Sequence, residues 1–175
     1  MAIPDGTEVY STHGDRVLFT ASRSNESMSA LEPCNHEEAD TRLMVHVSDA
    51  ASRGYSTISI RTNDTDVVVL AVSVVEAIPA VQLWITFGLG KNVRHIPAHA
   101  VAASLGPSRS LALPMFHALT GCDTVSFFRK HGKKSAWDVW QVFPELTPVL
   151  QELKTSAGAI TEESKSMLEA PGTFI

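Results

Sequence analysis

The chain has 175 residues, of which 44% are hydrophobic and 19% are charged, and such a composition is typical of one globular domain with a sizeable core. Its formal net charge of −5 argues against a protein that binds nucleic acid through overall charge, although it is compatible with a local basic patch. Two cysteines, Cys34 and Cys122, argue against a disulfide framework and indicate free thiols in a reducing compartment.

No membrane or secretory signal is visible in the sequence. Residues 1–10 lack the basic and apolar regions of a signal peptide, and the longest apolar run, 67–75, is too short to span a bilayer. We therefore expect a nuclear or cytoplasmic protein with no membrane partner.

The first third of the chain predicts a hairpin followed by a helix and a strand. Residues 7–22 contain two β-rich runs around a His-Gly-Asp turn, which is typical of a hairpin. Asn35 is a good helix N-cap with Glu38 three residues later, and Gly54 is a good helix end. The apolar face of this helix would comprise Ala39, Leu43, Met44, Val47, Ala50 and Ala51. Residues 55–62 follow as a strand.

The remaining elements alternate between strands and helices. Residues 63–80 are ambiguous, because their valines favour a strand whereas their length and Asn/Asp start favour a helix. Strands are predicted at 81–88 and 92–97, and helices at 98–106, 108–121, 133–143 and 145–154. We expect Pro114 to kink or break the second of these helices. The alternation indicates an α/β fold.

Acidic residues stand at the ends of several predicted elements. Each alone is explained by a structural role, because acids at helix starts accept backbone N–H bonds and complement the helix dipole. Asp64 and Asp66, however, follow a strand at the edge where α/β sheets bind ligands. Acids that converge there need cations to neutralise them, and Mg²⁺ or Mn²⁺ prefers such oxygen ligands. The candidate metal ligands are Glu38, Asp40, Asp64, Asp66 and Asp123, of which Asp64, Asp66 and Asp123 are also the candidate catalytic residues.

A basic segment, 127–137, precedes one of the later predicted helices. A glycine turn into a helix start presents backbone N–H groups to phosphate, and neighbouring lysines add positive charge. The candidate nucleic-acid-binding residues are Arg129, Lys130, Gly132, Lys133 and Lys134. A solvated basic loop is the alternative interpretation. His117, Trp137 and Trp140 are interpreted as packing residues of the core.

The order of four short motifs resembles a known family. They are Glu-Ala-Asp at 38–40, Asp-Thr-Asp at 64–66, Leu-Thr-Gly-Cys-Asp at 119–123 and His-Gly-Lys-Lys-Ser-Ala at 131–136. In this order they are similar to the C-terminal half of the PIN-like domain of flap-endonuclease-type 5′ nucleases, over residues 34–142. Some of these stretches are also similar to uncharacterised animal proteins of the same divergent kind.

The resemblance implies a three-layer, Rossmann-like α/β sheet with flanking helices, together with the N-terminal hairpin. It implies metal-dependent hydrolysis of phosphodiester bonds by two-metal chemistry, with Mg²⁺ or Mn²⁺ as cofactor and nucleic acid as partner, DNA being favoured over RNA. It divides the chain into a hairpin segment, a nuclease-like core and a helical extension, at 1–33, 34–142 and 143–175.

The chain departs from the family pattern at its start. The family's first strand carries further metal-binding aspartates, and nothing before Thr7 supplies this strand. We therefore expect a divergent or truncated relative with weak or no activity, whose sheet a missing N-terminal segment or a partner chain would complete. The alternative is a non-catalytic nucleic-acid-binding or scaffold module that keeps the fold.

Overall fold

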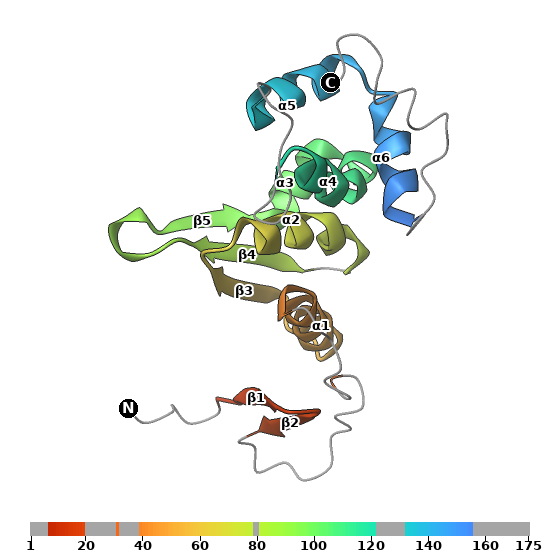
Figure 1. Ribbon diagram of the computed structural model, residues 1–175. Helices are drawn as coiled ribbons and strands as arrows, with labels where there is room; N and C mark the ends of the chain where they lie inside the picture. Colours follow the sequence, from red (N-terminus) through yellow and green to blue (C-terminus); the bar gives the residue numbers. More distant parts are fainter. Residues whose placement is uncertain (1–6, 20–30, 32–38, 79–80, 122–131, 156–175) are drawn as a thin grey trace. The chain divides into compact units, whose positions relative to one another are not determined.

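The computed structural model describes residues 7–19, 31, 39–78, 81–121 and 132–155 (Figure 1). The chain divides into two compact units, residues 1–55 and 56–175. The fold is mixed α/β, with an antiparallel hairpin in the first unit and a three-stranded mixed sheet with helices in the second. Within the described residues, no helix combines the length and apolar character needed to cross a membrane.

The first unit contains the predicted hairpin and the predicted helix. Strands β1 (Tyr10–His13) and β2 (Arg16–Phe19) pair antiparallel, and Gly14 in their turn has a φ of 60°. Helix α1 (Ala39–Ser52) is followed by Gly54, whose φ of 91° lies in the left-handed region that ends helices. The predicted hairpin and helix end are therefore confirmed over the residues described.

A polar network within the first unit joins the hairpin to the end of α1. The hydroxyl of Tyr10 donates to Glu8 Oε2 at 2.7 Å, and Arg53 Nη1 donates to the Tyr10 oxygen at 2.5 Å. Arg53 Nε also pairs with Asp49 Oδ2 at 2.9 Å. The hydrogen bond to Glu8, together with burial, raises the pKa of Tyr10 above its usual value.

The core face of α1 is only partly the one expected from its apolar residues. Val47 is buried, whereas Leu43 and Met44 are half-buried. Arg42, which the apolar pattern does not include, is also buried, and its guanidinium donates to the carbonyl oxygen of Leu31. A long side chain of this kind can bury its aliphatic stem when its charged end finds an acceptor.

The second unit is built on a sheet in the order β3-β4-β5, in which β3 (Thr57–Thr62), β4 (Gln82–Phe87) and β5 (Arg94–Pro97) form the predicted strands. β3 and β4 are parallel, with Ile60 opposite Ile85, and β5 is antiparallel to β4. Leu83 and Ile85 are fully buried, as the alternating pattern of this strand predicts.

Five helices and two short 3₁₀ turns complete the described part of this unit. The ambiguous segment is helical over residues 65–77, and α2 begins directly after a capping residue, Asp64. Helix α3 contacts β4, and α2 contacts both α3 and α4 (Figure 1). The helices are α2 (Thr65–Val74), α3 (Ala98–Leu105), α4 (Pro107–Leu119), α5 (Lys133–Val142) and α6 (Leu146–Thr155), and the 3₁₀ turns are η2 (Val75–Ala77) and η3 (Gly90–Asn92).

Pro114 was expected to kink or break the helix around it, and the structure excludes the break. Helix α4 continues through this residue to Leu119. A proline within a helix removes the hydrogen bond to the carbonyl four residues earlier, here that of Ser110. Burial of Ala112 and Phe116, on either side of the proline, holds the helix together despite this loss.

An apolar cluster fixes the last three helices relative to one another. Trp140 has no exposed surface and stacks on Phe116, with ring centroids 4.7 Å apart. Its indole N–H donates to Thr147 Oγ1 at 3.0 Å. The cluster also contains Ala112, Ala136, Leu146 and Leu150. The predicted packing role of Trp140 is confirmed, and the cluster thereby positions the C-terminal end of α4 next to the start of α5.

Candidate functional site

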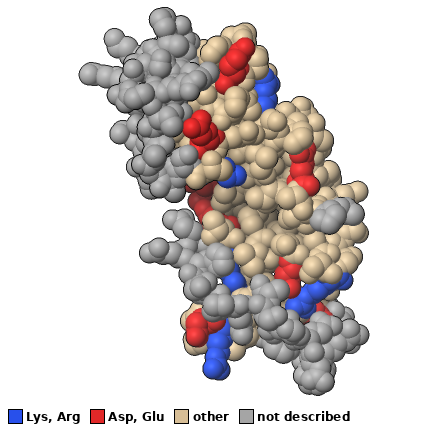
Figure 2. All heavy atoms as spheres, turned by 90° about the vertical axis from the view of Figure 1, so that its right-hand side faces the viewer, with Lys and Arg blue, Asp and Glu red and all other residues tan. Residues whose placement is uncertain are grey.

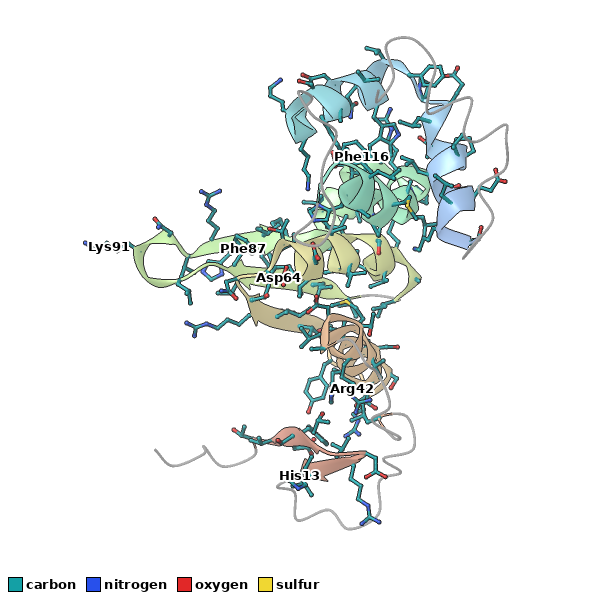
Figure 3. All side chains as sticks on the ribbon, in the orientation of Figure 1. His13, Arg42, Asp64, Phe87, Lys91 and Phe116 are labelled. Atoms are coloured by element: carbon teal, nitrogen blue, oxygen red, sulfur yellow. The ribbon has the colours of Figure 1, made fainter. Side chains whose placement is uncertain are left out.

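A polar cavity of about 620 Å³ lies at the carboxyl end of β3. This is the edge at which ligands bind in open α/β sheets. Among the described residues, three chain segments line it: the turn from β3 into α2, the end of α4, and the start of α5 (Figure 3, where Asp64 is labelled). The lining residues are Asn63, Asp64, Thr65, Asp66, His117, Gly121 and Lys133. We call this space the acidic cavity.

Asp64 caps helix α2 at the edge of the acidic cavity. Its backbone is extended, with φ −98° and ψ 129°, and its Oδ1 accepts the N–H of Asp66 at 2.8 Å. Its own N–H donates to Thr62 Oγ1 at 3.0 Å. Asp64 thus has the ordinary structural role of an acid at a helix start, and this cap uses one of its two carboxylate oxygens.

Asp66, His117 and Lys133 form a hydrogen-bonded chain across the cavity wall. His117 Nε2 lies 2.7 Å from Asp66 Oδ1, and His117 Nδ1 lies 2.9 Å from Lys133 Nζ. An ammonium group can only donate, so Nδ1 accepts from Lys133 and the ring proton on Nε2 is donated to the carboxylate. Lys133 also donates to the carbonyl oxygen of Gly121 at 2.8 Å. The imidazole therefore connects a positive charge on α5 with a negative charge on α2.

The burial of this chain changes from one end to the other. The side chain of His117 is 11% exposed, whereas that of Asp66 is 43% exposed. The histidine is held from both sides inside the wall, while the carboxylate faces the cavity. The second oxygen of Asp66 is thus placed to meet a ligand without loss of the bond to His117.

The other site residues predicted from the sequence lie elsewhere or outside the described residues. Asp40 is in the first turn of α1, in the first compact unit. Gly132 is the N-cap residue of α5, and Lys134 is exposed and paired with Asp138 Oδ2 at 2.7 Å. The remaining predicted site residues, which the structure does not describe, are Glu38, Asp123, Arg129 and Lys130.

His117 is a site residue that the sequence interpretation missed. It is buried, as expected of a core histidine, but both ring nitrogens bond to charged residues of the acidic cavity. The signal that was present is its place in the last turn of the helix leading into the Leu-Thr-Gly-Cys-Asp motif. Which acid His117 contacts depends on how α4 packs against α2, and this packing cannot be predicted from the local sequence.

The acidic cavity offers two carboxylates as possible ligands for a hard divalent cation. Each of Asp64 and Asp66 has one oxygen in the bonds described above and a second oxygen beyond them. Binding of Mg²⁺ by this pair is a proposal, and it agrees with the habit of Mg²⁺ to bind proteins through one or two carboxylates while keeping several waters. In the part of the chain that the structure describes, no three His, Cys, Asp or Glu side chains are grouped as metal ligands. A second cation would need acids beyond this pair.

The charged side chains on one face of the molecule are mixed rather than gathered in one patch. Figure 2 shows acidic and basic side chains interspersed among uncharged ones on the face in view. The overall charge of −5 gives no general attraction for an anionic ligand, so such attraction would depend on individual basic residues such as Lys133.

No family model, no curated protein and no solved structure matches this chain. The likeness to flap-endonuclease-type nucleases therefore depends on the four sequence motifs alone. What the chain can do has to be argued from the residues and geometry of the acidic cavity.

Proposed function

We propose that the chain is a divergent PIN-like domain that binds nucleic acid and hydrolyses its phosphodiester bonds with the help of a divalent cation. The observation that supports this most is the meeting of Asp64, Asp66 and Lys133 around one cavity at the carboxyl end of β3. Two carboxylates provide a place for a cation, and the ammonium adds a positive charge that attracts phosphate.

The residues of the cavity would divide the work between them. Asp64 and Asp66 would hold Mg²⁺ or Mn²⁺ through the oxygens that the helix cap and His117 leave over. His117 keeps the Asp66 carboxylate in one orientation, and Lys133 adds positive charge at the same wall. When bound, the cation would supply Lewis-acid stabilisation of charge on the phosphoryl oxygens. Because the described residues offer two acids, we expect slow hydrolysis from this chain alone.

A cleavage assay with fluorescently labelled DNA and RNA, in Mn²⁺ and in Mg²⁺, tests this proposal. Asp64→Asn is the sharpest variant, because asparagine caps a helix about as well as aspartate but carries no charge. We expect Asp64→Asn and Asp66→Asn each to lower the cleavage rate about a hundredfold or more, the scale of one lost electrostatic contact. Glu145→Gln, an exposed acid between α5 and α6, is the matched control and should leave the rate unchanged.

A non-catalytic nucleic-acid-binding module is the second candidate. The observation that favours it is that both acids already have structural partners, the start of α2 for Asp64 and His117 for Asp66. Under this function no cation-dependent cleavage occurs, while binding persists and weakens steeply with salt. Lys133→Gln should then weaken binding, whereas Asp64→Asn should leave it unchanged or strengthen it.

A further inference from the structure

A second, apolar hollow adjoins the acidic cavity. It has a volume of about 360 Å³ and is lined by Val69, Leu113, Phe116, His117, Lys133, Lys134 and Trp137. We call it the apolar recess. His117 and Lys133 line both spaces, so one wall separates a polar compartment from an apolar one. Phe116, labelled in Figure 3, belongs to α4 and lies beside His117 in sequence.

The aromatic wall of the recess is held in a fixed orientation. Trp137 is half-buried and meets Phe116 edge to face, with centroids 5.7 Å apart and ring planes at 76°. It meets Trp140 in the same manner, at 5.4 Å and 85°. A ring braced from two sides needs little further ordering when a flat ligand packs against it.

The rim of the recess carries positive charge. Lys133 and Lys134 both line it, and Lys134 is highly exposed next to Asp138. A ligand that suits this arrangement has a flat apolar part joined to an anionic part. The volume lies near the lower end of the ~300–1,000 Å³ range of small-molecule sites. Aromatic side chains combined with lysines are the usual means of holding single-stranded nucleic acid.

We propose that the apolar recess binds the nucleobase next to the phosphate held in the acidic cavity, with Trp137 as its aromatic contact. This inference rests on the proposed function, because it adds a base-binding subsite to the same phosphodiester site. A base stacked within a duplex cannot enter such a recess. The substrate class is therefore a single strand, or an unpaired nucleotide at a junction or end, rather than continuous duplex.

The test compares two labelled oligonucleotides of equal length and charge, one of thymidines and one with abasic sugars throughout. Their affinities for the full chain are measured by fluorescence anisotropy, in EDTA to prevent hydrolysis. We expect the thymidine strand to bind about tenfold more tightly, equivalent to about 1.4 kcal/mol, which lies within the range for stacking of one base on an aromatic ring.

Two variants connect this preference to the recess. Trp137→Leu removes the aromatic contact, and Val69→Phe fills the recess while leaving the aromatic cluster intact. Each should lower the thymidine preference to nearly one while leaving the affinity for the abasic strand unchanged. Val142→Ala is the matched control, since Val142 lies on the same helix with 82% of its surface exposed. Its preference should equal that of the wild type.

Other results overturn the inference in distinguishable ways. If both strands bind equally, or if the preference survives in both variants, the recess holds no base and the proposed function still stands. If neither strand binds, the recess inference and the proposed function fall together. If Val69→Phe raises the melting temperature and leaves the preference intact, the recess belongs to the packing of the chain itself.

Discussion

The two compact units each contain a network of paired charges, and the two networks differ in what they face. In the first unit, Arg53 contacts Asp49 and Tyr10, and its side chain and that of Asp49 are 19% and 12% exposed. In the second unit, Asp66 is 43% exposed although it lies 2.7 Å from a buried histidine. The first network joins a hairpin to a helix, whereas the second lines a cavity of about 620 Å³.

The difference shows that an acidic side chain with a hydrogen-bond partner can still be accessible to a ligand. The Asp66–His117 pair keeps its carboxylate accessible from the cavity, and the buried histidine fixes where this carboxylate points. Under the proposed function this carboxylate receives a cation, whereas the arrangement around Arg53 holds two elements together.

The largest effect is expected from a variant that removes the packing of α5 against α4, which positions the residues of the second network. Trp140→Ala removes the ring that packs α5 against α4, and we expect the unfolding free energy to fall by about 3–5 kcal/mol. Urea denaturation followed by circular dichroism measures the change. Val142→Ala, on the exposed side of the same helix, should stay within about 0.5 kcal/mol of the wild type. An equal loss in both variants would contradict the packing role of Trp140.

Double-mutant cycles compare the two networks directly. We expect the coupling between His117 and Asp66 to be about 1–2 kcal/mol, because the His117 N–H donates a hydrogen bond to a charged carboxylate at 2.7 Å. The coupling between Arg53 and Asp49 should be about 0.3–0.5 kcal/mol, the usual size for such a pair one helical turn apart. The cycles use His117→Ala with Asp66→Ala, and Arg53→Ala with Asp49→Ala, in thermal or urea unfolding. Equal couplings would remove the distinction between the networks.

The contribution of the Asp64 helix cap to stability can be separated from the contribution of its negative charge. Asp64→Ala loses the bond to the N–H of Asp66, and we expect a cost of about 1 kcal/mol in stability. Asp64→Asn keeps an oxygen that accepts this bond, and it should cost only a few tenths of the stability lost in Asp64→Ala. Unfolding curves of both variants, without metal, measure the two values. A large loss for Asp64→Asn would mean that the negative charge itself stabilises α2.

The smallest expected effect is a pH dependence in the first unit. Burial, with a contribution from Arg42, lowers the pKa of His46 below its ordinary value of about 6.5. The unfolded chain then binds this proton at a higher pH than the folded chain, so stability is full above pH 6.5 and declines as the pH falls below it. His46→Gln should flatten this part of the stability profile. A wild-type profile that rises on acidification would contradict the sign.

The sequence was informative about local structure and less informative about the site. The strand at 82–87 follows from its alternating pattern, and the end of the helix at 39–52 follows from Gly54. The segment at 63–80 stayed ambiguous because intrinsic preference and cap disagreed, and the cap at Asp64 decided it. The helix through Pro114 persists because tertiary burial outweighs one lost hydrogen bond.

Only those residues of the acidic cavity that lie close together in the sequence could be predicted from it. Asp64 and Asp66 follow a strand, so their place at a sheet edge could be inferred. The bond between His117 and Asp66 joins residues 51 positions apart and depends on the packing of α4 on α2. Lys133 was expected to contact nucleic acid, and its bonds to His117 and Gly121 place it in the cavity wall instead of on an open loop.

Cation binding by the acidic cavity is the central claim, and thermal unfolding in Mn²⁺ tests it most directly. At a hundredfold excess over its dissociation constant, a ligand of the folded state stabilises it by about 2.7 kcal/mol. We predict that Mn²⁺ raises the melting temperature of the wild type and of Glu145→Gln, and that Asp64→Asn combined with Asp66→Asn abolishes this rise. No rise in the wild type, or an equal rise in the double variant, would contradict the account.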